Sequence, residues 1–456
     1  MGAQYNIAIA KFGGSSLETV SRMLRCAQIV VARPHIRLVV LSATGGTTDQ
    51  LLQIACFASE GQWMEAQSLL KSIRSRHLQM AAELNCESVT SEQILELFEE
   101  AGRLAHGMQL LKEASPRVLD QLLSIGERGS SLLFLAALRH EGASAEVLDA
   151  RQVLCTSDNY GKAEPQIEAI AARGTDLLLP RLRQGELLVT QGFIGATPCG
   201  STTTLGRGGS DYTAALLGEA LGVSHIEIWT DVPGIASGDP RIIHSAVPIK
   251  EISFSEAAEL ATFGAKVLHP STLWPAIRNN LPVFVGSSQE PEAEGTWIRR
   301  EVEASPDVRA ISVRRAQLLL TVHSLSMLRR PGFLARVFSV LAEHKISVDL
   351  VTTSEVRVSL TIDEPDRLDN KVLDALGSFA HVEVEKGLAL VAVIGNRATS
   401  TPGIARSVFE TIKNNVRLIC HGASPHNLCF LVDDAVSVEV ACRLHKELIE
   451  GERICV

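Results

Sequence analysis

The residues best suited to chemistry lie in a glycine-rich stretch, residues 200–214, with the sequence GSTTTLGRGGSDYTA. An apolar run precedes it and a helical run of small residues follows, so we expect a strand, a loop and a helix start. Glycines let the backbone approach a ligand, and free amides at a helix start attract anions. Arg207 adds a planar cation that suits a carboxylate or phosphate. Asp211 could be a simple N-cap, but beside this arginine we expect it to take part in the site.

Two further small-residue loops follow predicted strands. The strand at residues 5–10 leads into Lys11 and the pair Gly13 and Gly14, and the next strand ends in residues 42–48, SATGGTT. Open α/β sheets bind ligands at the carboxyl ends of their strands. Neither GxxxxGK[ST] nor GxGxxG occurs, which argues against a P-loop or a dinucleotide fingerprint. The three loops together predict one anion-binding edge.

Composition limits the classes of partner. The 456 residues are 46% hydrophobic and 21% charged, with a formal net charge of −9. A net acidic chain is not attracted to nucleic acid or to an anionic membrane surface, so neither partner is expected. The nine cysteines contain no CxxC, which predicts free thiols of a reducing compartment rather than a zinc or redox site. With no signal peptide or membrane-length apolar run, we expect a cytoplasmic protein.

Elements alternate over the first 300 residues. Strand and helix patterns follow one another, and a long helical region at residues 50–138 contains Glu127 between two glycines. The polar stretch at residues 287–307, rich in Pro and Glu, is interpreted as a linker. We therefore predict an α/β domain over residues 1–299, an open and mostly parallel sheet with helices on both faces.

The remaining residues contain an internal repeat. Residues 331–333, PGF, align with residues 402–404, PGI, and the alternating runs that follow each of them also align at a period of roughly 70 residues. Each copy has the order β, turn, α, β, β. Two such α+β units cover each other's sheet edges, which predicts a paired regulatory module with boundaries at 300–388 and 389–456.

In this order and spacing, the motifs closely resemble aspartate kinase of the monofunctional, lysine-sensitive type. They are KFGGSS at 11–16, TTTLGRGGSDYTA at 202–214, WTDVPG at 229–234, ATFGAKVLHP at 261–270 and KISVDLVTTSE at 345–355. The resemblance covers essentially the whole chain. It implies an amino-acid-kinase fold followed by two ferredoxin-like ACT domains. It also implies phosphorylation of the side-chain carboxylate of L-aspartate by MgATP to 4-phospho-L-aspartate, feedback inhibition by L-lysine, and a homodimer or an effector-dependent tetramer.

The same resemblance implies roles for individual residues. Lys11 would stabilise the transferring phosphoryl group, Arg207 would bind the α-carboxylate of aspartate, and Glu127 would bind its ammonium group. Asp211 would orient Lys11 or the metal shell, with Mg²⁺ held mainly by ATP oxygens.

The implied binding sets are larger. The substrate set is Ser42, Thr48, Glu127, Arg207, Gly208, Gly209 and Ser210. The nucleotide set is Lys11, Gly13, Gly14, Thr230, Asp231, Arg241, Lys266 and Val267. The lysine pocket is Met327, Arg330, Phe333, Leu334, Ser347, Val348, Asp349, Ser354 and Glu355. Two departures from the family bear on these sets. Ala236 replaces a Tyr, which predicts weaker ATP binding, and Arg330 replaces a Ser, which predicts weaker lysine binding.

Other readings are less well supported. Acetylglutamate and uridylate kinases share the first domain but lack tandem ACT units, and the length disfavours a fused homoserine dehydrogenase. A catalytically silent amino-acid sensor would use only the paired units. Retention of Lys11, Glu127, Arg207 and Asp211 argues for an active enzyme.

Overall fold

The chain forms two compact units in a computed structural model that describes residues 5–264, 270–302, 306–328, 331–363 and 367–451. The first unit contains residues 1–235, 248–254 and 266–302, and the second contains residues 236–247, 255–265 and 303–456. No helix within the described ranges is long and apolar enough to cross a membrane.

The first unit is built on an eight-stranded sheet of order β3-β4-β2-β1-β7-β9-β10-β8. Its strands are β1 (Tyr5–Phe12), β2 (Ile36–Leu41), β3 (Ala145–Leu148), β4 (Leu187–Gln191), β7 (Val223–Thr230), β8 (Glu251–Ser253), β9 (Val283–Ser287) and β10 (Thr296–Arg299). All neighbours are parallel except β9 and β10. The central strands are buried, as expected of a parallel sheet covered on both faces.

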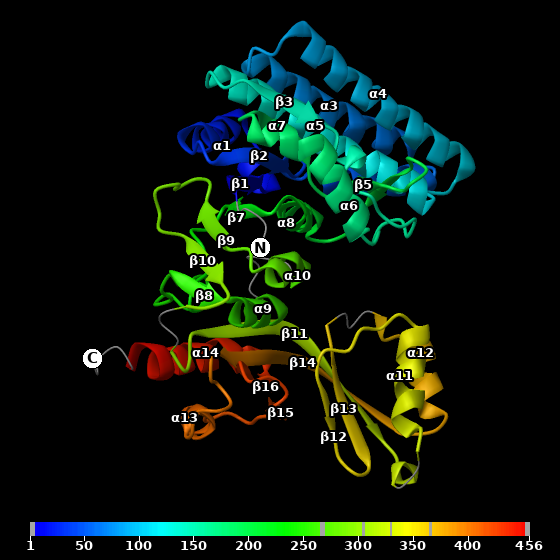
Figure 1. The fold of residues 1–456 in the computed structure, drawn as a ribbon. Helices are drawn as coiled ribbons and strands as arrows, with labels where there is room; N and C mark the ends of the chain where they lie inside the picture. Colours follow the sequence, from blue (N-terminus) through cyan, green and yellow to red (C-terminus); the bar gives the residue numbers. More distant parts are fainter. Residues whose placement is uncertain (1–4, 265–269, 303–305, 329–330, 364–366, 452–456) are drawn as a thin grey trace. The chain divides into compact units, whose positions relative to one another are not determined.

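Helices cover both faces of this sheet, which confirms the predicted fold class (Figure 1). They are α1 (Val20–Ala32), α2 (Thr47–Ser59), α3 (Trp63–Glu83), α4 (Ser88–Leu111), α5 (Pro116–His140), α6 (Ile167–Arg173), α7 (Leu179–Arg183), α8 (Gly209–Leu221) and α10 (Pro270–Asn279), with a 3₁₀ turn at Gly14–Leu17. Along β1, Phe12 packs on Phe134 of α5, with ring centroids 5.6 Å apart. Lys11, one residue earlier, points to the opposite face, because side chains alternate along a strand.

Two local features differ from the sequence expectations. A hairpin of β5 (Ile194–Ala196) and β6 (Thr202–Thr204) lies between β4 and the glycine-rich loop, where a single loop was expected. The prediction of a linker at residues 287–307 was wrong for β10, which extends the sheet. This strand has only four residues, which are too few to show an alternating pattern among the surrounding Pro and Glu residues.

The second unit contains a six-stranded antiparallel sheet of order β12-β13-β11-β14-β16-β15. Its strands are β11 (Ala310–His323), β12 (Val351–Thr353), β13 (Arg357–Ile362), β14 (His381–Ile394), β15 (Leu418–His421) and β16 (Asn427–Asp433). Its helices are α9 (Phe254–Thr262, whose residues from 255 belong to this unit), α11 (Phe333–Glu343), α12 (Asn370–Gly377), α13 (Ile404–Thr411) and α14 (Ser437–His445). The predicted repeat of α+β units is confirmed.

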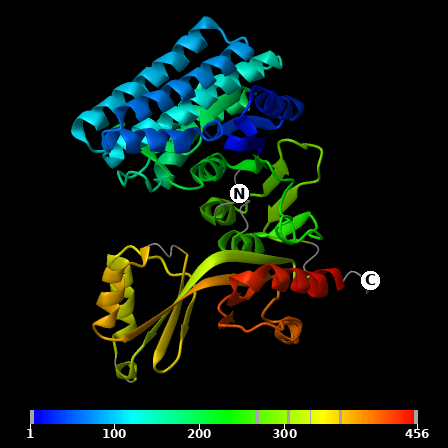
Figure 2. The ribbon, with the colours of Figure 1, turned by 180° about the vertical axis from the view of Figure 1, so that it is seen from behind.

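The sheet has two lobes, one containing β12 and β13 and the other containing β15 and β16. The two long strands β11 and β14 run through both lobes (Figure 2). The first half of β11 pairs with the second half of β14, beside β16, and the second half of β11 pairs with β13 and the first half of β14. The lobe containing β12 and β13 is therefore inserted in the chain of the lobe containing β15 and β16. The contiguous boundaries 300–388 and 389–456 stay a prediction.

A buried ion pair joins α9 to the start of β11 in this unit. Arg309 Nε lies 2.7 Å from Glu256 Oε1, and the two residues are 8% and 0% exposed. Removing one member of a buried pair leaves the other charge without compensation, whereas apolar replacement of both is often neutral.

We therefore expect Arg309→Met to lower the free energy of unfolding by about 3–5 kcal/mol, and Glu256→Leu/Arg309→Met to recover most of it. Urea denaturation of the full chain measures both. Arg406→Met, which breaks an exposed pair with Glu410, is the matched control and should cost about 1 kcal/mol or less. A cost for Arg309→Met no larger than the control's would contradict the role of the pair.

Candidate active site

A cavity of about 610 Å³ opens at the carboxyl ends of β1 and β2, beside the first turns of α2 and α8. It brings together residues that lie more than 190 positions apart in the sequence. The expected site residues on its wall are Lys11, Gly14, Ser42, Thr48, Glu127, Arg207, Gly208, Gly209, Ser210 and Asp211. The structure therefore gathers the expected substrate set at one edge of the sheet.

Lys11 and Asp211 form an ion pair inside this cavity. Lys11 Nζ, at the end of β1, lies 2.5 Å from Asp211 Oδ1 in the first turn of α8, and the side chains are 10% and 15% exposed. The pair holds the ammonium group at the strand end and draws the helix start towards it. The amides of this first turn and the lysine then face the same space, which suits an anionic group.

The loop before α8 presents a cation, Arg207, to the cavity. Gly208 caps the helix with φ = 72°, a conformation that residues with a side chain rarely adopt. This turn places Arg207 on the cavity wall, where it is exposed, and within the described residues it has no hydrogen-bond or ion-pair partner. A free guanidinium fork at this position can bind a carboxylate through two hydrogen bonds.

Glu127 contributes the opposite charge from inside the unit. It lies within α5 and is 3% exposed, and burial raises the pKa of its carboxyl group to about 8. Oε1 accepts a hydrogen bond from the Ala43 amide at 3.1 Å, while Oε2 has no partner among the described residues. Gly126 permits this approach, since a Cβ there would lie 2.8 Å from the Ala43 side chain. The unsatisfied oxygen lies in a cavity that a cationic group can enter.

A hydrogen-bond chain that no sequence motif indicates supports the loop between β2 and α2. His77 Nδ1 donates to the Ile73 carbonyl, and burial lowers its pKa to about 4, so the ring is neutral and Nε2 accepts. Thr44 therefore donates to Nε2 at 3.1 Å, Thr47 donates to Thr44 at 2.6 Å, and Arg76 donates to Thr47 at 2.7 Å. The directions of the hydrogen bonds are all fixed, which holds the loop rigid.

Two more residues of the cavity wall were missed. Asp120 accepts hydrogen bonds from the amides of Gly161 and Thr204 and from the Thr204 hydroxyl, at 2.8–2.9 Å. Phe193 has φ = 68°, an uncommon conformation for a bulky residue, and its amide donates to Thr213 of α8. No sequence pattern signals either feature, since both depend on contacts across the fold.

The expected nucleotide residues are only partly gathered. The Gly13 amide already donates to the Trp229 carbonyl at 3.2 Å, and Gly13 does not line the cavity, so of the two glycines only Gly14 does. Thr230, the last residue of β7, donates to Asp231 at 3.0 Å. Arg241 belongs to the second unit and pairs with Asp239. Lys266 and Val267 lie outside the described residues.

The expected lysine pocket falls in the lobe that contains β12 and β13. Its members within the described residues are Met327, Phe333, Leu334, Ser347, Val348, Asp349, Ser354 and Glu355. Arg330 lies outside the described residues.

Asp349 already has a cationic partner. Arg314 of β11 lies 2.8 Å from Asp349 and 2.8 Å from Asp363. Burial and the neighbouring Asp363 raise the pKa of Asp349 to about 6, although Arg314 opposes this shift. Arg314 also donates to the Thr262 carbonyl at the end of α9, at 3.0 Å.

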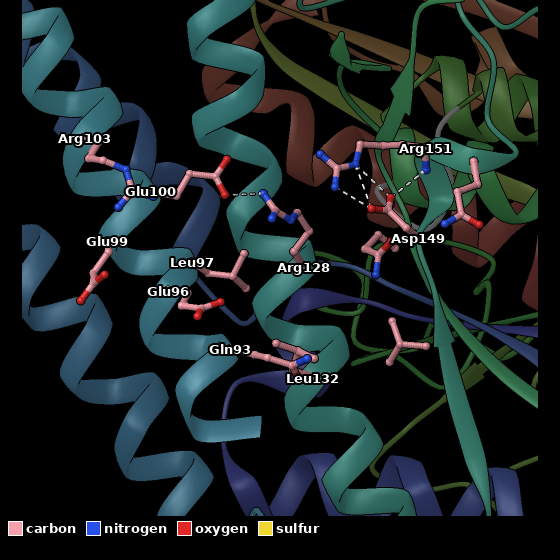
Figure 3. A pocket seen from close by; sticks show the side chains of 13 residues that line it. Gln93, Glu96, Leu97, Glu99, Glu100, Arg103, Arg128, Leu132, Asp149 and Arg151 are labelled. Atoms are coloured by element: carbon pink, nitrogen blue, oxygen red, sulfur yellow. Dashed lines mark hydrogen bonds and ion pairs between the residues drawn. The ribbon is translucent and has the colours of Figure 1, made fainter. Parts of the chain in front are cut away.

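A larger cavity of about 750 Å³ lies between α4 and α5 (Figure 3). Two of its arginines are paired: Arg128 with Glu100 at 2.9 Å, and Arg151 with Asp149 at 2.5 Å. It contains none of the expected site residues. The smaller cavity, with its free arginine and half-satisfied carboxylate, is therefore the candidate active site.

Comparison with known proteins gives the same picture. The Amino acid kinase family matches residues 6–287, and the ACT domain matches residues 320–370 and 391–448. The lysine-sensitive aspartokinase 3 of Escherichia coli (strain K12) is 48% identical, covering 97% of this chain and 99% of that protein. Aspartokinase 1, chloroplastic, of Arabidopsis thaliana is 36% identical, covering 97% of this chain and 80% of that protein.

Solved structures agree over the same length. The structure of E. coli aspartokinase III in complex with aspartate and ADP has a TM-score of 0.87, and the complex with lysine and aspartate has 0.84. Both are 48% identical to this chain, and they cover 97% and 98% of it. With these matches over nearly its whole length, the chain belongs to the aspartokinases, within the amino acid kinase family.

Proposed function

We propose that the chain transfers the γ-phosphoryl group of ATP to the side-chain carboxylate of L-aspartate, giving 4-phospho-L-aspartate and ADP. The observation that carries the proposal is the pairing of opposite charges in one cavity. Among the residues that the structure describes, Arg207 offers an unpaired cation and Glu127 offers a buried carboxylate oxygen without a partner. A free amino acid carries the complementary pair, an α-carboxylate and an ammonium group. The E. coli relative was solved with aspartate and ADP.

In this proposal Arg207 binds the α-carboxylate and Glu127 binds the ammonium group. The side-chain carboxylate then lies near Lys11 and attacks the γ-phosphorus. One bond forms between a carboxylate oxygen and phosphorus, and the bond from phosphorus to the bridging oxygen breaks, so ADP leaves. A carboxylate needs no general base, because it is already an ionised nucleophile. Catalysis then consists of positioning and of stabilising negative charge, for which Lys11 and the first amides of α8 are placed.

The hydrogen bonds and ion pairs of the acidic side chains in the cavity limit how many protein ligands the proposed Mg²⁺ would have. Asp120 accepts hydrogen bonds from two amides, Glu127 from one, and Asp211 is paired with Lys11, while Asp49 is exposed. This set fits an ion that takes most of its ligands from nucleotide phosphates and water, with few from protein. Mg²⁺ would neutralise charge on the phosphates that Lys11 also faces.

We also propose that L-lysine inhibits the enzyme through the pocket around Asp349. An ammonium group of lysine would compete with Arg314 for this carboxylate. Once Arg314 is released from Asp349, its hydrogen bond to the Thr262 carbonyl could change. Thr262 lies four residues before Lys266 of the expected nucleotide set. A homodimer or tetramer and a cytoplasmic location belong to the same proposal. The eight described cysteines, all free thiols, fit a reducing compartment.

The test of the activity is formation of aspartyl hydroxamate that requires ATP, Mg²⁺ and aspartate. We expect Lys11→Met to lower kcat about 10²–10³-fold with little change in ATP affinity, because its charge acts mainly on the transition state. Lys250→Met, at an exposed pair with Glu294, is the control and should behave as wild type. No aspartate-dependent product from the wild type would favour a silent sensor instead, and a Lys11→Met enzyme with near-normal kcat would remove this lysine from catalysis.

The raised pKa of Glu127 predicts a pH dependence of aspartate binding. In the free protein the group is largely protonated below pH 8, and binding of an ammonium group requires the ionised form. Affinity should therefore rise with pH by up to tenfold per unit and level off above about pH 8, with a proton released on binding below that value.

Isothermal titration in buffers of different ionisation enthalpy measures this proton. Glu127→Gln should weaken aspartate binding at least about thirtyfold above pH 8 and remove the pH dependence, because a buried charged partner is lost. Asp49→Asn, an exposed acid of the same cavity, is the control. The same pH profile in wild type and Glu127→Gln would show that another group binds the ammonium.

For regulation, we expect Asp349→Asn to raise the lysine concentration that gives half inhibition at least about thirtyfold, with unchanged kcat. Asp363→Asn is the matched control, since Asp363 is the other carboxylate that contacts Arg314 and is outside the expected pocket. Its effect should be at most about fivefold, as for an exposed ion pair. Steady-state inhibition curves decide, and equal loss of inhibition in both variants would mean that the Arg314 network, rather than a lysine contact of Asp349, controls the response.

A further inference from the structure

A cluster of two histidines and a glutamate lies at the amino end of the first unit's sheet, opposite the edge that carries the active site. His35 precedes β2, and His225 and Glu227 lie on one face of β7. Their ligand atoms all lie within 4.8 Å of one another, and among the described residues no other group of three such side chains meets this spacing. None of the three takes part in the proposed reaction.

The strand between them leaves room for the cluster. β1 separates β2 from β7, and its residues Ala8 and Ala10 are in register with His225 and Glu227. Because partner residues in a parallel sheet point to the same face, only two methyl groups occupy the strand between the clustered side chains. His35 therefore reaches the Glu227 carboxylate across β1, and His225 reaches it along β7 itself.

Both imidazoles point the same nitrogen at the same oxygen. His35 Nε2 lies 2.8 Å from Glu227 Oε1, and His225 Nε2 lies 3.2 Å from it. In a tetrahedral zinc site with bonds of about 2.0–2.1 Å, neighbouring ligand atoms lie about 3.3 Å apart, so a small outward movement would fit an ion. Glu227 Oε2 accepts a hydrogen bond from Trp229 Nε1 at 3.0 Å, which fixes the carboxylate.

The proton positions favour a bound cation. Ser224 donates its single hydroxyl hydrogen to the Ile7 carbonyl at 2.9 Å, so it accepts from His225 Nδ1, also at 2.9 Å. In neutral His225 the lone pair of Nε2 then faces Glu227 Oε1, which is also an acceptor. Such a contact requires either a second proton on the ring or a metal ion. A metal-binding histidine commonly donates its other nitrogen to an oxygen in this way.

From this geometry we infer that His35, His225 and Glu227 form a binding site for a borderline divalent cation of the Zn²⁺ class. Two imidazoles and a carboxylate are a known ligand set for zinc, and the fourth position would hold water. His35 is 32% exposed at its side chain and lies on the wall of a hollow of about 560 Å³, which gives an entry path. The ion would join β2 to β7 across β1.

Zinc titration of the full-length, chelator-treated protein against a chromophoric zinc chelator tests the site. The wild type should bind one zinc ion more than His35→Ala or His225→Ala, or bind it at least about tenfold more tightly. His381→Ala, at an exposed histidine that contacts Glu383, should match the wild type. The comparison among variants removes any contribution of cysteine thiols.

A second readout keeps the site testable if His225→Ala does not fold. His35→Asn changes a half-exposed residue outside the strand, and circular dichroism with the hydroxamate assay checks its fold. Cobalt in the wild type should give the visible bands of a tetrahedral centre, and these should be absent in His35→Asn. Equal zinc binding in the wild type and both His35 variants, or no binding by the wild type, would overturn the site and leave an imidazolium–carboxylate pair.

Discussion

The arrangement of the active site depends on one unfavourable interaction, the burial of the Glu127 carboxyl group with a hydrogen-bond partner for only one oxygen among the described residues. Removing an ionised carboxylate from water without full compensation is costly, which is why its pKa rises to about 8. The neighbouring residues hold the Glu127 carboxyl group in this buried position. Gly126 allows α5 to approach Ala43, and the chain from Arg76 to His77 holds that loop in place. Below about pH 8 the free protein avoids this cost by keeping Glu127 protonated, and a bound ammonium group would stabilise the ionised form.

The positive groups of the cavity are required by a different constraint, the negative net charge of the chain. The chain carries a net charge of −9, so long-range attraction does not bring aspartate or ATP to it. Local cationic groups must attract these anions instead, and Arg207 and Lys11 attract them in different ways. Arg207 has no partner within the described residues and is free to bind a carboxylate. Lys11 is held by Asp211, which fixes its position while leaving two of its three hydrogens for phosphate oxygens.

The sequence predicted the site residues at the edge of the sheet but not the buried residues that support them. Lys11, Arg207 and Asp211 could be found because each lies in a local pattern of strand, glycine and helix start. His77 and Asp120 could not, because each lies in a long helical region where its spacing resembles that of a solvated residue. The cluster of His35, His225 and Glu227 was missed for another reason, because its members come from two strand regions about 190 residues apart and show no local spacing.

A related limit applies to the second unit. The repeat was visible because each copy contains the same Pro-Gly turn and alternating run. That the copies share two strands was not visible, because pairing of β11 with β14 depends on partners about 70 residues apart. Sharing has a physical consequence: a change at the β12 and β13 end of β11 acts on a strand whose other end is hydrogen-bonded in the second lobe. Arg314 lies where the register of β11 against β14 shifts, between these two halves. A ligand that competes for its carboxylate partners would therefore act beside this irregularity in the pairing of the two shared strands.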